Sequence, residues 1–377
     1  MNKKEIKILI TGDFCPLNRI DDLINAENYG SIFNDFLPLI KESDIAITNL
    51  ECPVTQTSEK IKKTGPNLKA PVKSVKALVF AGFKLVTLAN NHIMDFGVTG
   101  LDSTIEACNK SGIDFIGVGS NLQEARKPKY NEINGIRVAF INFCENEWAT
   151  TNGDAPGANP LNPVANYYDI KEAKANADHV IVIVHGGHEH YSLPSPRMQE
   201  TYRFFVDAGA SAVVSHHTHC FSGFEVYNNA PIFYSLGNFV FDWNNKRNSS
   251  WNIGYAVQLE VTLDAVNFLI HPYRQGDLQP GVLLLNMQEK EEFENELSRL
   301  NNFIGNKTLL QQQFNELASR RKAYYKYLVE PFNNRIFSIL YARKLVPSFL
   351  TTKRRNLFLN ITRCEAHRDL LIKSLTE

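Results

Sequence analysis

Residues 179–190, HVIVIVHGGHEH, carry the clearest signal for the fold class of this protein. The first half of this stretch is an unbroken run of mostly β-branched side chains, which is typical of a strand covered on both faces of a sheet. Its second half is polar and rich in histidine, so the strand is expected to end where ligand-type side chains begin. Strands of this kind alternate with helices in α/β proteins, and the stretch therefore predicts that class.

The same pattern of a short apolar run, a polar cluster and a helical segment repeats along the first two-thirds of the chain. Strands are predicted at Ile6–Thr11, Ile45–Leu50, Leu85–Ala89, Phe115–Val118, Val138–Phe143, His179–His185 and Ala212–Ser215. Helical spacing, ended by small residues or glycine, is found at Val72–Ala81, Gly100–Ser111 and Met198–Gly209. From Pro231 on, the segments PIFYSLGNFVF, GYAVQLEV and NFLIHPYR predict further strands, which we expect to be antiparallel.

The last part of the chain has a different character, because it is helical and charged from about Gln288 onward. We therefore predict one domain over residues 1–285 and a helical C-terminal module over residues 286–377. Segments of the module such as KAYYKYLVEPFNNRIFSILYARKL mix aromatic and basic residues. Plain helical packing, a cover over an active-site mouth, subunit pairing and contact with a membrane surface all fit this mixture.

The composition indicates which kinds of partner the protein can have and in which cellular compartment we expect it. The 377 residues carry 40 Lys and Arg and 40 Asp and Glu, so no overall charge attracts nucleic acid. The six cysteines are scattered without metal-type spacing, which predicts reduced thiols. The first apolar run is too short for a signal peptide, and no window approaches the roughly 20 apolar residues of a membrane span. We therefore expect a cytoplasmic protein without a transmembrane segment.

Polar clusters follow almost every predicted strand, and ligands of open α/β sheets bind at that edge. The clusters are Gly12-Asp13, Asn49-Leu50-Glu51, Asn90-Asn91-His92, His185 to Glu189, His216 to His219 and Gly237-Asn238. Their carboxylates, imidazoles and amides are the ligand set of manganese, iron, zinc or magnesium.

Taken singly, each cluster has a simpler interpretation. Asp13 can cap a turn, Glu51 can lie in the cap of a following segment, and a lone His185 can be a hydrogen-bonded core residue. His217 and His219 are different, because two histidines two residues apart in a turn can aim at one point. The conjunction of clusters at successive strand ends favours a metal site.

Six motifs in order, GDF, NLECPVT, LANNHIMDFG, VHGGHE, HHTH and YSLGNFVFD, resemble the CapA family of capsule and poly-γ-glutamate biosynthesis proteins. The resemblance covers roughly residues 6 to 245. The family's domain is similar to calcineurin-like metallophosphatases. The resemblance therefore implies a four-layer α/β/β/α sandwich, here followed by the helical module.

The resemblance also implies roles for individual residues. The implied ligands of a divalent metal, expected as two ions, are Asp13, Glu51, Asn91, His185, His217 and His219. His92 would protonate a leaving group, while Asp95 either orients its ring or caps the next helix. The remaining pocket residues expected are Asn49, Glu189, His216 and Asn238. Cys15 stands where metallophosphatases usually have a histidine, and it is either a thiolate ligand or a buried neutral thiol.

Two functional hypotheses follow from this site. The first is a metal-dependent hydrolase that acts on a phosphoester, amide or ester in the biosynthesis of a capsule or poly-γ-glutamate type polymer. Its partners would be a polymer precursor or small-molecule substrate and the polymer synthesis machinery. The second is a non-catalytic component or scaffold of a polymer synthesis or export machinery. Retention of most metal-type residues favours the first.

Overall fold

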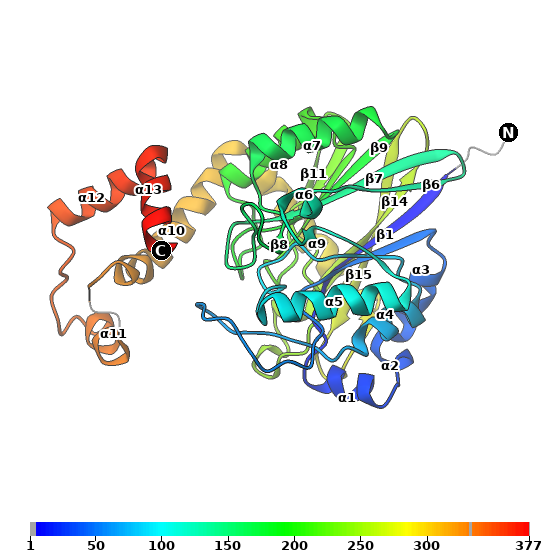
Figure 1. Ribbon diagram of the computed structural model, residues 1–377, viewed down its shortest axis with the longest axis horizontal. Coiled ribbons are helices and arrows are strands. Elements are labelled where there is room, and N and C mark those ends of the chain that lie inside the picture. Colours follow the sequence, from blue (N-terminus) through cyan, green and yellow to red (C-terminus); the bar gives the residue numbers. More distant parts are fainter. Residues whose placement is uncertain (1–4, 332–333, 377) are drawn as a thin grey trace. The chain divides into compact units, whose positions relative to one another are not determined.

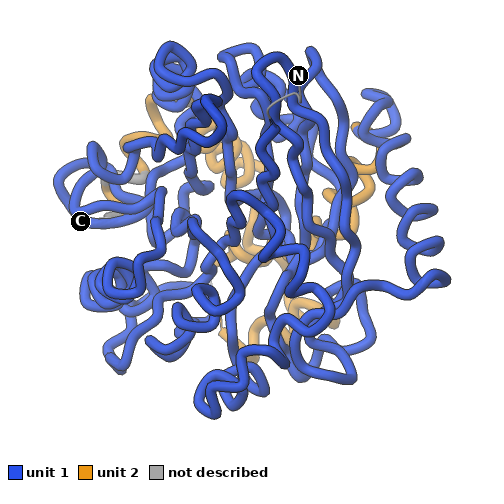
Figure 2. The backbone as a smooth tube through the Cα atoms, turned by 90° about the vertical axis from the view of Figure 1, so that its right-hand side faces the viewer, with its two compact units in different colours: residues 1–310 blue, residues 311–377 orange. Residues whose placement is uncertain are grey.

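The computed structural model describes residues 5–331 and 334–376, which form two compact units, residues 1–310 and 311–377 (Figure 2). The division falls within helix α10 (Lys307–Leu328), so that helix α9 (Met287–Ile304) belongs to the first unit. The domain boundary predicted near residue 285 stays a prediction, because the division at residue 310 separates compact units and does not test where the domain ends. Within the described residues, no helix is both long and apolar enough to cross a bilayer.

The first unit contains two large mixed sheets. The first sheet has the order β16-β15-β14-β1-β2-β3-β4, with β13 paired to β1 beyond the end of β14. Its strands are β1 (Ile6–Phe14), β2 (Ile45–Leu50), β3 (Leu85–Thr87), β4 (Asp114–Ile116), β13 (Asn238–Val240), β14 (Ile253–Val261), β15 (Val266–Gln275) and β16 (Val282–Leu284). Strands β1 to β4 are parallel to one another, and β14 to β16 are antiparallel.

The second sheet has the order β11-β12-β10-β9-β7-β6. Its strands are β6 (Lys129–Ile133), β7 (Ile136–Cys144), β9 (His179–His185), β10 (Ala212–His216), β11 (Phe224–Tyr227) and β12 (Ala230–Phe233). The central four strands are parallel, and the outer β6 and β11 are antiparallel to their neighbours. A separate ribbon pairs β5 (Val118–Gly119) with β8 (Gly157–Ala158).

Helices cover the outer face of each sheet, which produces the predicted four-layer α/β/β/α sandwich (Figure 1). The first sheet is covered by α1 (Arg19–Asn25), α2 (Gly30–Phe33), α3 (Leu37–Lys41), α4 (Ser74–Ala81) and α5 (Gly97–Ser111). The second sheet is covered by α7 (Pro163–Ala175) and α8 (Pro196–Asp207), and a single turn, α6 (Leu122–Ala125), follows β5. Between the sheets, the Phe233 and Phe268 rings meet with centroids 5.1 Å apart.

Local signals explain most of these elements. All seven residues of β9 are buried, as expected for a strand covered on both faces. Helix α5 ends at Gly112, whose φ of 69° is the left-handed conformation that glycine adopts easily. Helix α8 begins two residues before the predicted start, because Ser195 caps it and Pro196 occupies its first position.

The expected antiparallel arrangement after Pro231 is right for β14 and β15, right only in part for β12, which is antiparallel to β11 but not to β10, and wrong for β13. Strand β12 runs parallel to β10, and β13 runs parallel to β1. The stretch PIFYSLGNFVF therefore leaves one sheet and enters the other, turning at Gly237, where φ is 76°. This change of sheet brings Asn238 to the edge of the first sheet.

The second unit is helical, as predicted for the end of the chain. It contains the C-terminal part of α10 together with α11 (Arg335–Ala342), α12 (Thr352–Arg363) and α13 (Glu365–Thr376). Glu330 is buried beside the segment after α11, where its carboxylate accepts hydrogen bonds from the backbone N–H of Phe349 and from Ser348.

Candidate metal centre

The first sheet brings three polar residues side by side at the carboxyl ends of its strands. Asp13 of β1 pairs in register with Asn49 of β2 on one side and with Asn238 of β13 on the other. The approach of β13 requires Gly12, because a Cβ atom there would lie 2.0 Å from the carbonyl oxygen of Gly237. Glu51 follows directly after β2 and is fully buried.

The second sheet contributes the histidines. His185 ends β9 and is in register with His216, which ends β10. His217 and His219 follow with φ angles of 95° and 58°, a left-handed region that non-glycine residues rarely adopt and that is often found at functional sites. The backbone N–H of His217 donates to Asp13 over 3.1 Å, which joins the edges of the two sheets.

Four side chains from both sheets converge on the first group of donor atoms. His185 Nε2 lies 3.0 Å from Asn91 Oδ1, 3.0 Å from His217 Nδ1 and 3.6 Å from Glu51 Oε1. Donor atoms bonded to one ion at about 2.0–2.2 Å stand roughly 3.0 to 3.6 Å apart in octahedral or tetrahedral geometry. The spacing of this group therefore matches a coordination shell.

A second group of donors comprises Asp13, Glu51 and His219. His219 Nε2 lies 3.8 Å from Glu51 Oε1, while its Nδ1 lies 2.9 Å from Asn238 Oδ1. A neutral histidine that donates Nδ1–H to an amide oxygen presents Nε2 as a ligand. Glu51 belongs to both groups, as a bridging carboxylate between two ions would.

The surroundings of the Glu51 carboxylate show whether a cation would fit between these residues. Neither carboxylate oxygen of Glu51 accepts a hydrogen bond from any described residue, although both are buried. Burial, followed by repulsion from Asp13, raises the pKa of Glu51 well above its ordinary value. An unpaired carboxylate costs free energy in such a place unless a cation neutralises it, so the residues fit a divalent metal.

The imidazoles of His185 and His219 are kept in the neutral form by their surroundings. Burial lowers the pKa of His185 well below its ordinary value, and the nearby His217 adds to this shift. Burial also lowers the pKa of His219 to about 3. Trp251 covers the His219 ring with centroids 4.6 Å apart, which keeps water away from it. Neutral imidazoles bind metals, whereas protonated ones do not.

His92 lies beside the donor groups and is held by a buried ion pair. Its Nδ1 is 2.7 Å from Asp95 Oδ2, which also accepts the backbone N–H of Leu68 over 2.7 Å. Lys63 forms an ion pair with the other oxygen of Asp95, and its Nζ lies 3.2 Å from His92 Nδ1. Only 3% of the Lys63 side chain is exposed. Asp95 therefore contacts the His92 ring and does not cap a helix by its side chain.

Other residues predicted for the pocket have different surroundings. Asn49 donates to Asp13 over 2.7 Å and lies 3.1 Å from His185 Nδ1, so it links a ligand-type residue of each sheet. The ring of His216 lies 2.9 Å from the carbonyl oxygen of Thr11 and belongs to neither donor group. Glu189 is exposed in the loop after β9.

Cys15 lies in the apolar cluster between the first sheet and its helices, together with Cys52. Burial, followed by the neighbouring Cys52, raises the pKa of the Cys15 thiol well above its ordinary value. A buried thiol of this kind stays protonated and does not bind metal as a thiolate. Nothing in the structure places Cys15 in either donor group.

Sequence reasoning missed Lys63 and Trp251. Lys63 belongs to the basic segment EKIKK of the long connection after β2, and such a charge run normally indicates a solvated loop. Trp251 lies in a turn before β14, without a polar motif. No sequence signal distinguishes these two residues, because only the tertiary fold carries them to the site.

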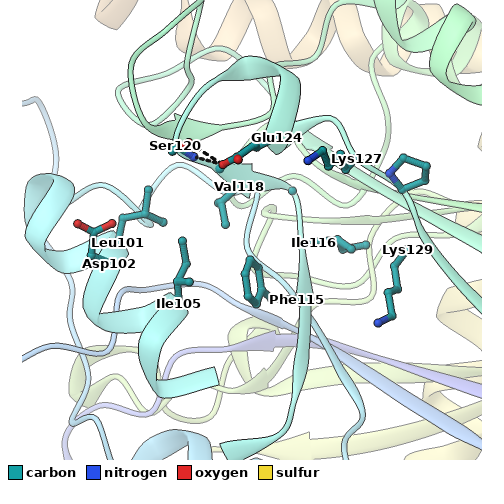
Figure 3. Close-up of a pocket in the computed structure, with 13 residues that line it drawn as sticks. Leu101, Asp102, Ile105, Phe115, Ile116, Val118, Ser120, Glu124, Lys127 and Lys129 are labelled. Atoms are coloured by element: carbon teal, nitrogen blue, oxygen red, sulfur yellow. Dashed lines mark hydrogen bonds between the residues drawn. The ribbon is translucent and has the colours of Figure 1, made fainter. Parts of the chain in front are cut away.

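A cavity of about 460 Å³ lies elsewhere, between α5, β4 and the segment that leads to β6 (Figure 3). Leu101, Ile105 and Phe115 line its apolar side, and Glu124 and Lys127 lie at its polar side. The Glu124 carboxylate is already bonded to Ser120. None of the predicted site residues lines this cavity.

The two stacked mixed sheets, with helices on their outer faces, define the chain as a four-layer α/β/β/α protein with a candidate metal site at one edge. More narrowly, the chain belongs to the bacterial capsule synthesis protein family PGA_cap, which matches residues 7–243. It is 35% identical over 258 residues to the capsule biosynthesis protein CapA of Bacillus anthracis, covering 66% of this chain and 63% of that protein. It is 36% identical over 245 residues to the PGA biosynthesis protein CapA of Bacillus subtilis, covering 63% and 64%.

The matched region thus spans less than two thirds of both relatives. Among solved structures, a novel phosphatase from Mycoplasma pneumoniae aligns with 73% of this chain and 96% of its own, at 16% identity and a TM-score of 0.48. A similarity of that strength supports no inference about function.

Proposed function

We propose that this protein is a metal-dependent hydrolase that acts on a phosphoester, amide or ester in the biosynthesis of a capsule or poly-γ-glutamate type polymer. The observation that carries the proposal is Glu51, a buried carboxylate without a hydrogen-bond donor that is shared by two groups of ligand atoms. Burying a carboxylate without a hydrogen-bond donor destabilises the fold. A site for two cations needs this negative charge, whereas a non-catalytic scaffold does not.

In this proposal, one divalent ion would be held by Asn91, His185, His217 and Glu51, and a second would be held by Asp13, His219 and Glu51. When bound there, two divalent ions would supply a water of lowered pKa and positive charge opposite the substrate oxygen. Manganese, iron, zinc and magnesium all accept this mixture of imidazole, carboxylate and amide ligands. Asn49 and Asn238 orient ligands from outside the coordination shells.

His92 is the proposed general acid. Its Nδ1 faces Asp95 and Lys63, so Nε2 is the nitrogen left to donate a proton to a leaving group. Asp95 holds the ring in place, and Lys63 holds Asp95. Replacing His92 by Ala should lower turnover and leave the metal content unchanged. Loss of metal from that variant would make His92 a ligand and contradict the assignment.

The proposed substrates and partners follow from the family. Proteins of this family and both CapA relatives are named for capsule or PGA synthesis, so a polymer precursor is the substrate proposed here. The polymer synthesis machinery is the proposed partner. We propose a cytoplasmic location, which is supported by the six free cysteines, five of them buried. Fractionation of cells that express the tagged chain, with a periplasmic or secreted marker as control, tests the location.

The decisive experiment is the metal content of protein purified without chelator, measured by mass spectrometry. Wild type is compared with a His217→Ala and His219→Ala double variant and with His367→Ala, a control that removes an exposed histidine from the second unit. We expect two equivalents of metal in wild type and in the control, and a loss in the double variant. Protein without stoichiometric metal, even after reconstitution, would favour the scaffold hypothesis.

Activity is then screened with the reconstituted protein against generic phosphomonoesters, phosphodiesters, amides and esters. The His92→Ala variant serves as the matched inactive control because it keeps every proposed ligand. Hydrolysis that requires both metal and His92 would support the proposal. If the metal-loaded His92→Ala variant hydrolyses every substrate at the rate of metal-loaded wild type, the proposal is contradicted.

A further inference from the structure

The second unit differs from the rest of the chain in charge. Residues 311–377 contain 13 of the 40 Lys and Arg residues but only five of the 40 Asp and Glu residues, a formal charge of +8. The first unit therefore carries −8, and the neutral total hides this division. A strongly basic unit of 67 residues has a local field that attracts an anionic surface.

Helix α11 has two apolar faces, and the unit covers only one of them. On the inner face, the Phe337 ring lies 6.4 Å from Tyr327 and 6.2 Å from Phe349, and the Tyr341 ring lies 5.7 Å from Tyr327. These contacts fix the orientation of the helix within the unit. No residue of α11 is buried in the described structure.

The outer face of α11 presents aliphatic side chains to solvent. Ile336 is 73% exposed and Ile339 is 43% exposed, and three positions apart they lie on one side of the helix. Leu345, just after the helix, is 66% exposed. Large aliphatic side chains grouped at a surface usually mark an interaction site.

Basic residues surround these side chains. Arg335 begins the helix, and Arg343 and Lys344 follow its end, all three exposed. None of them forms an ion pair with another described residue. We refer to these six residues, Arg335, Ile336, Ile339, Arg343, Lys344 and Leu345, as the α11 surface.

We propose that the α11 surface binds the surface of a bilayer that contains anionic lipid. The basic side chains would contact the lipid phosphates, while the aliphatic side chains enter the boundary between headgroups and acyl chains. A soluble polyanion such as a nucleic acid or an acidic polypeptide would use the charge but leave the isoleucines exposed to water. The combination of charge and aliphatic surface therefore favours lipid. The inference concerns the second unit and does not rest on the proposed hydrolase activity.

The test is co-sedimentation of the full chain with vesicles of phosphatidylcholine alone or mixed with phosphatidylglycerol. We expect binding to the mixed vesicles only, weakened at high salt because the charges are screened. An Arg343→Gln and Lys344→Gln double variant should bind about 25-fold more weakly, at about fivefold for each charge lost. Arg343→Lys, which keeps the charge, should bind like wild type.

An Ile336→Ser and Ile339→Ser double variant should also bind about tenfold more weakly or worse, because it loses the aliphatic contact. The matched control is Val164→Ser with Leu263→Ser, two exposed aliphatic residues of the first unit, which should bind like wild type. Circular dichroism melting establishes that each variant is folded.

Four results would overturn the proposal. Equal binding to both kinds of vesicle would remove the role of charge, and unchanged binding of both α11 double variants would place the contact elsewhere. A dimeric mass in light scattering that becomes monomeric in the isoleucine variant would show that a second copy covers this face. Binding to soluble polyglutamate or nucleic acid without binding to vesicles would make the partner a polyanion.

Discussion

Replacing Glu51 by Gln should have opposite effects on the stability of the protein with and without metal. The Glu51 carboxylate is fully buried, accepts no hydrogen bond from a described residue and faces the Asp13 carboxylate. A buried group left unpaired costs about 1–3 kcal/mol, and more when charged. The isosteric amide removes that charge, so the metal-free variant should be more stable than metal-free wild type by about 2 kcal/mol.

The same substitution should abolish stabilisation by metal. A ligand present at about 100 times its dissociation constant raises the free energy of unfolding by about 2.7 kcal/mol. Wild type should gain about that much for each ion bound, whereas Glu51→Gln lacks the carboxylate common to both donor groups and should gain little. Urea denaturation in chelator and in manganese, followed by tryptophan fluorescence, measures both effects.

The pH dependence gives an independent check with a definite sign. Because burial raises the folded-state pKa of Glu51, the unfolded state releases its proton first as pH rises. Metal-free wild type should therefore lose stability relative to Glu51→Gln as pH rises above about 4.3, the ordinary pKa of glutamate, until the folded pKa is passed. If the metal-free variant is less stable than metal-free wild type at neutral pH, the Glu51 carboxylate already has a partner and the prediction is wrong.

Three further substitutions test the supports of the site. Asn49→Ala should weaken metal binding about 10- to 100-fold in a competitive chelator titration, since it removes an amide that orients ligands of both sheets; unchanged affinity would show that the amide has no orienting role. Lys63→Met should lower the free energy of unfolding by about 3–5 kcal/mol because it leaves Asp95 buried without its counter-ion, and adding Asp95→Asn should restore part of the loss; equal urea midpoints for wild type and Lys63→Met would contradict this. Gly12→Ala should lower the stability by about 3 kcal/mol or more, because its Cβ would meet the backbone oxygen of Gly237; a melting temperature like that of wild type would mean that β13 can move away at little cost.

Much of the fold was accessible from the sequence because its signals are local. The seven predicted strands of the first two-thirds all exist, since each is a run of apolar residues with a polar end. Helix α7 was missed because only Asn166, Ile170 and Ala173 of its residues are buried, and since Asn166 is polar, two apolar residues are too few to show the helical period. Strand β6, at the edge of its sheet, is only partly buried and equally inconspicuous.

The candidate site, too, could be predicted only in part from the sequence. The clusters containing Asp13, Glu51, His185, His217 and His219 were visible as polar residues after strands, and the structure brings all five together. Their assignment as metal ligands remains a prediction. The sequence could not indicate that Glu51 lacks a donor, because that depends on every neighbour that the fold places around it.

Pairing between distant segments could not be predicted from local sequence. The stretch PIFYSLGNFVF reads as one or two strands, but nothing in it specifies that β12 joins β10 while β13 joins β1. Likewise, Lys63 reaches Asp95 only because the long connection after β2 packs against this residue, with the backbone N–H groups of Ile61 and Leu68 also bonded to Asp95. Local sequence was enough to locate most strands and the ligand-type side chains, since backbone propensity and apolar periodicity act over a few residues. Strand partners, burial and the charges that surround each side chain were left to packing over the whole chain, because these depend on residues that are far apart in sequence.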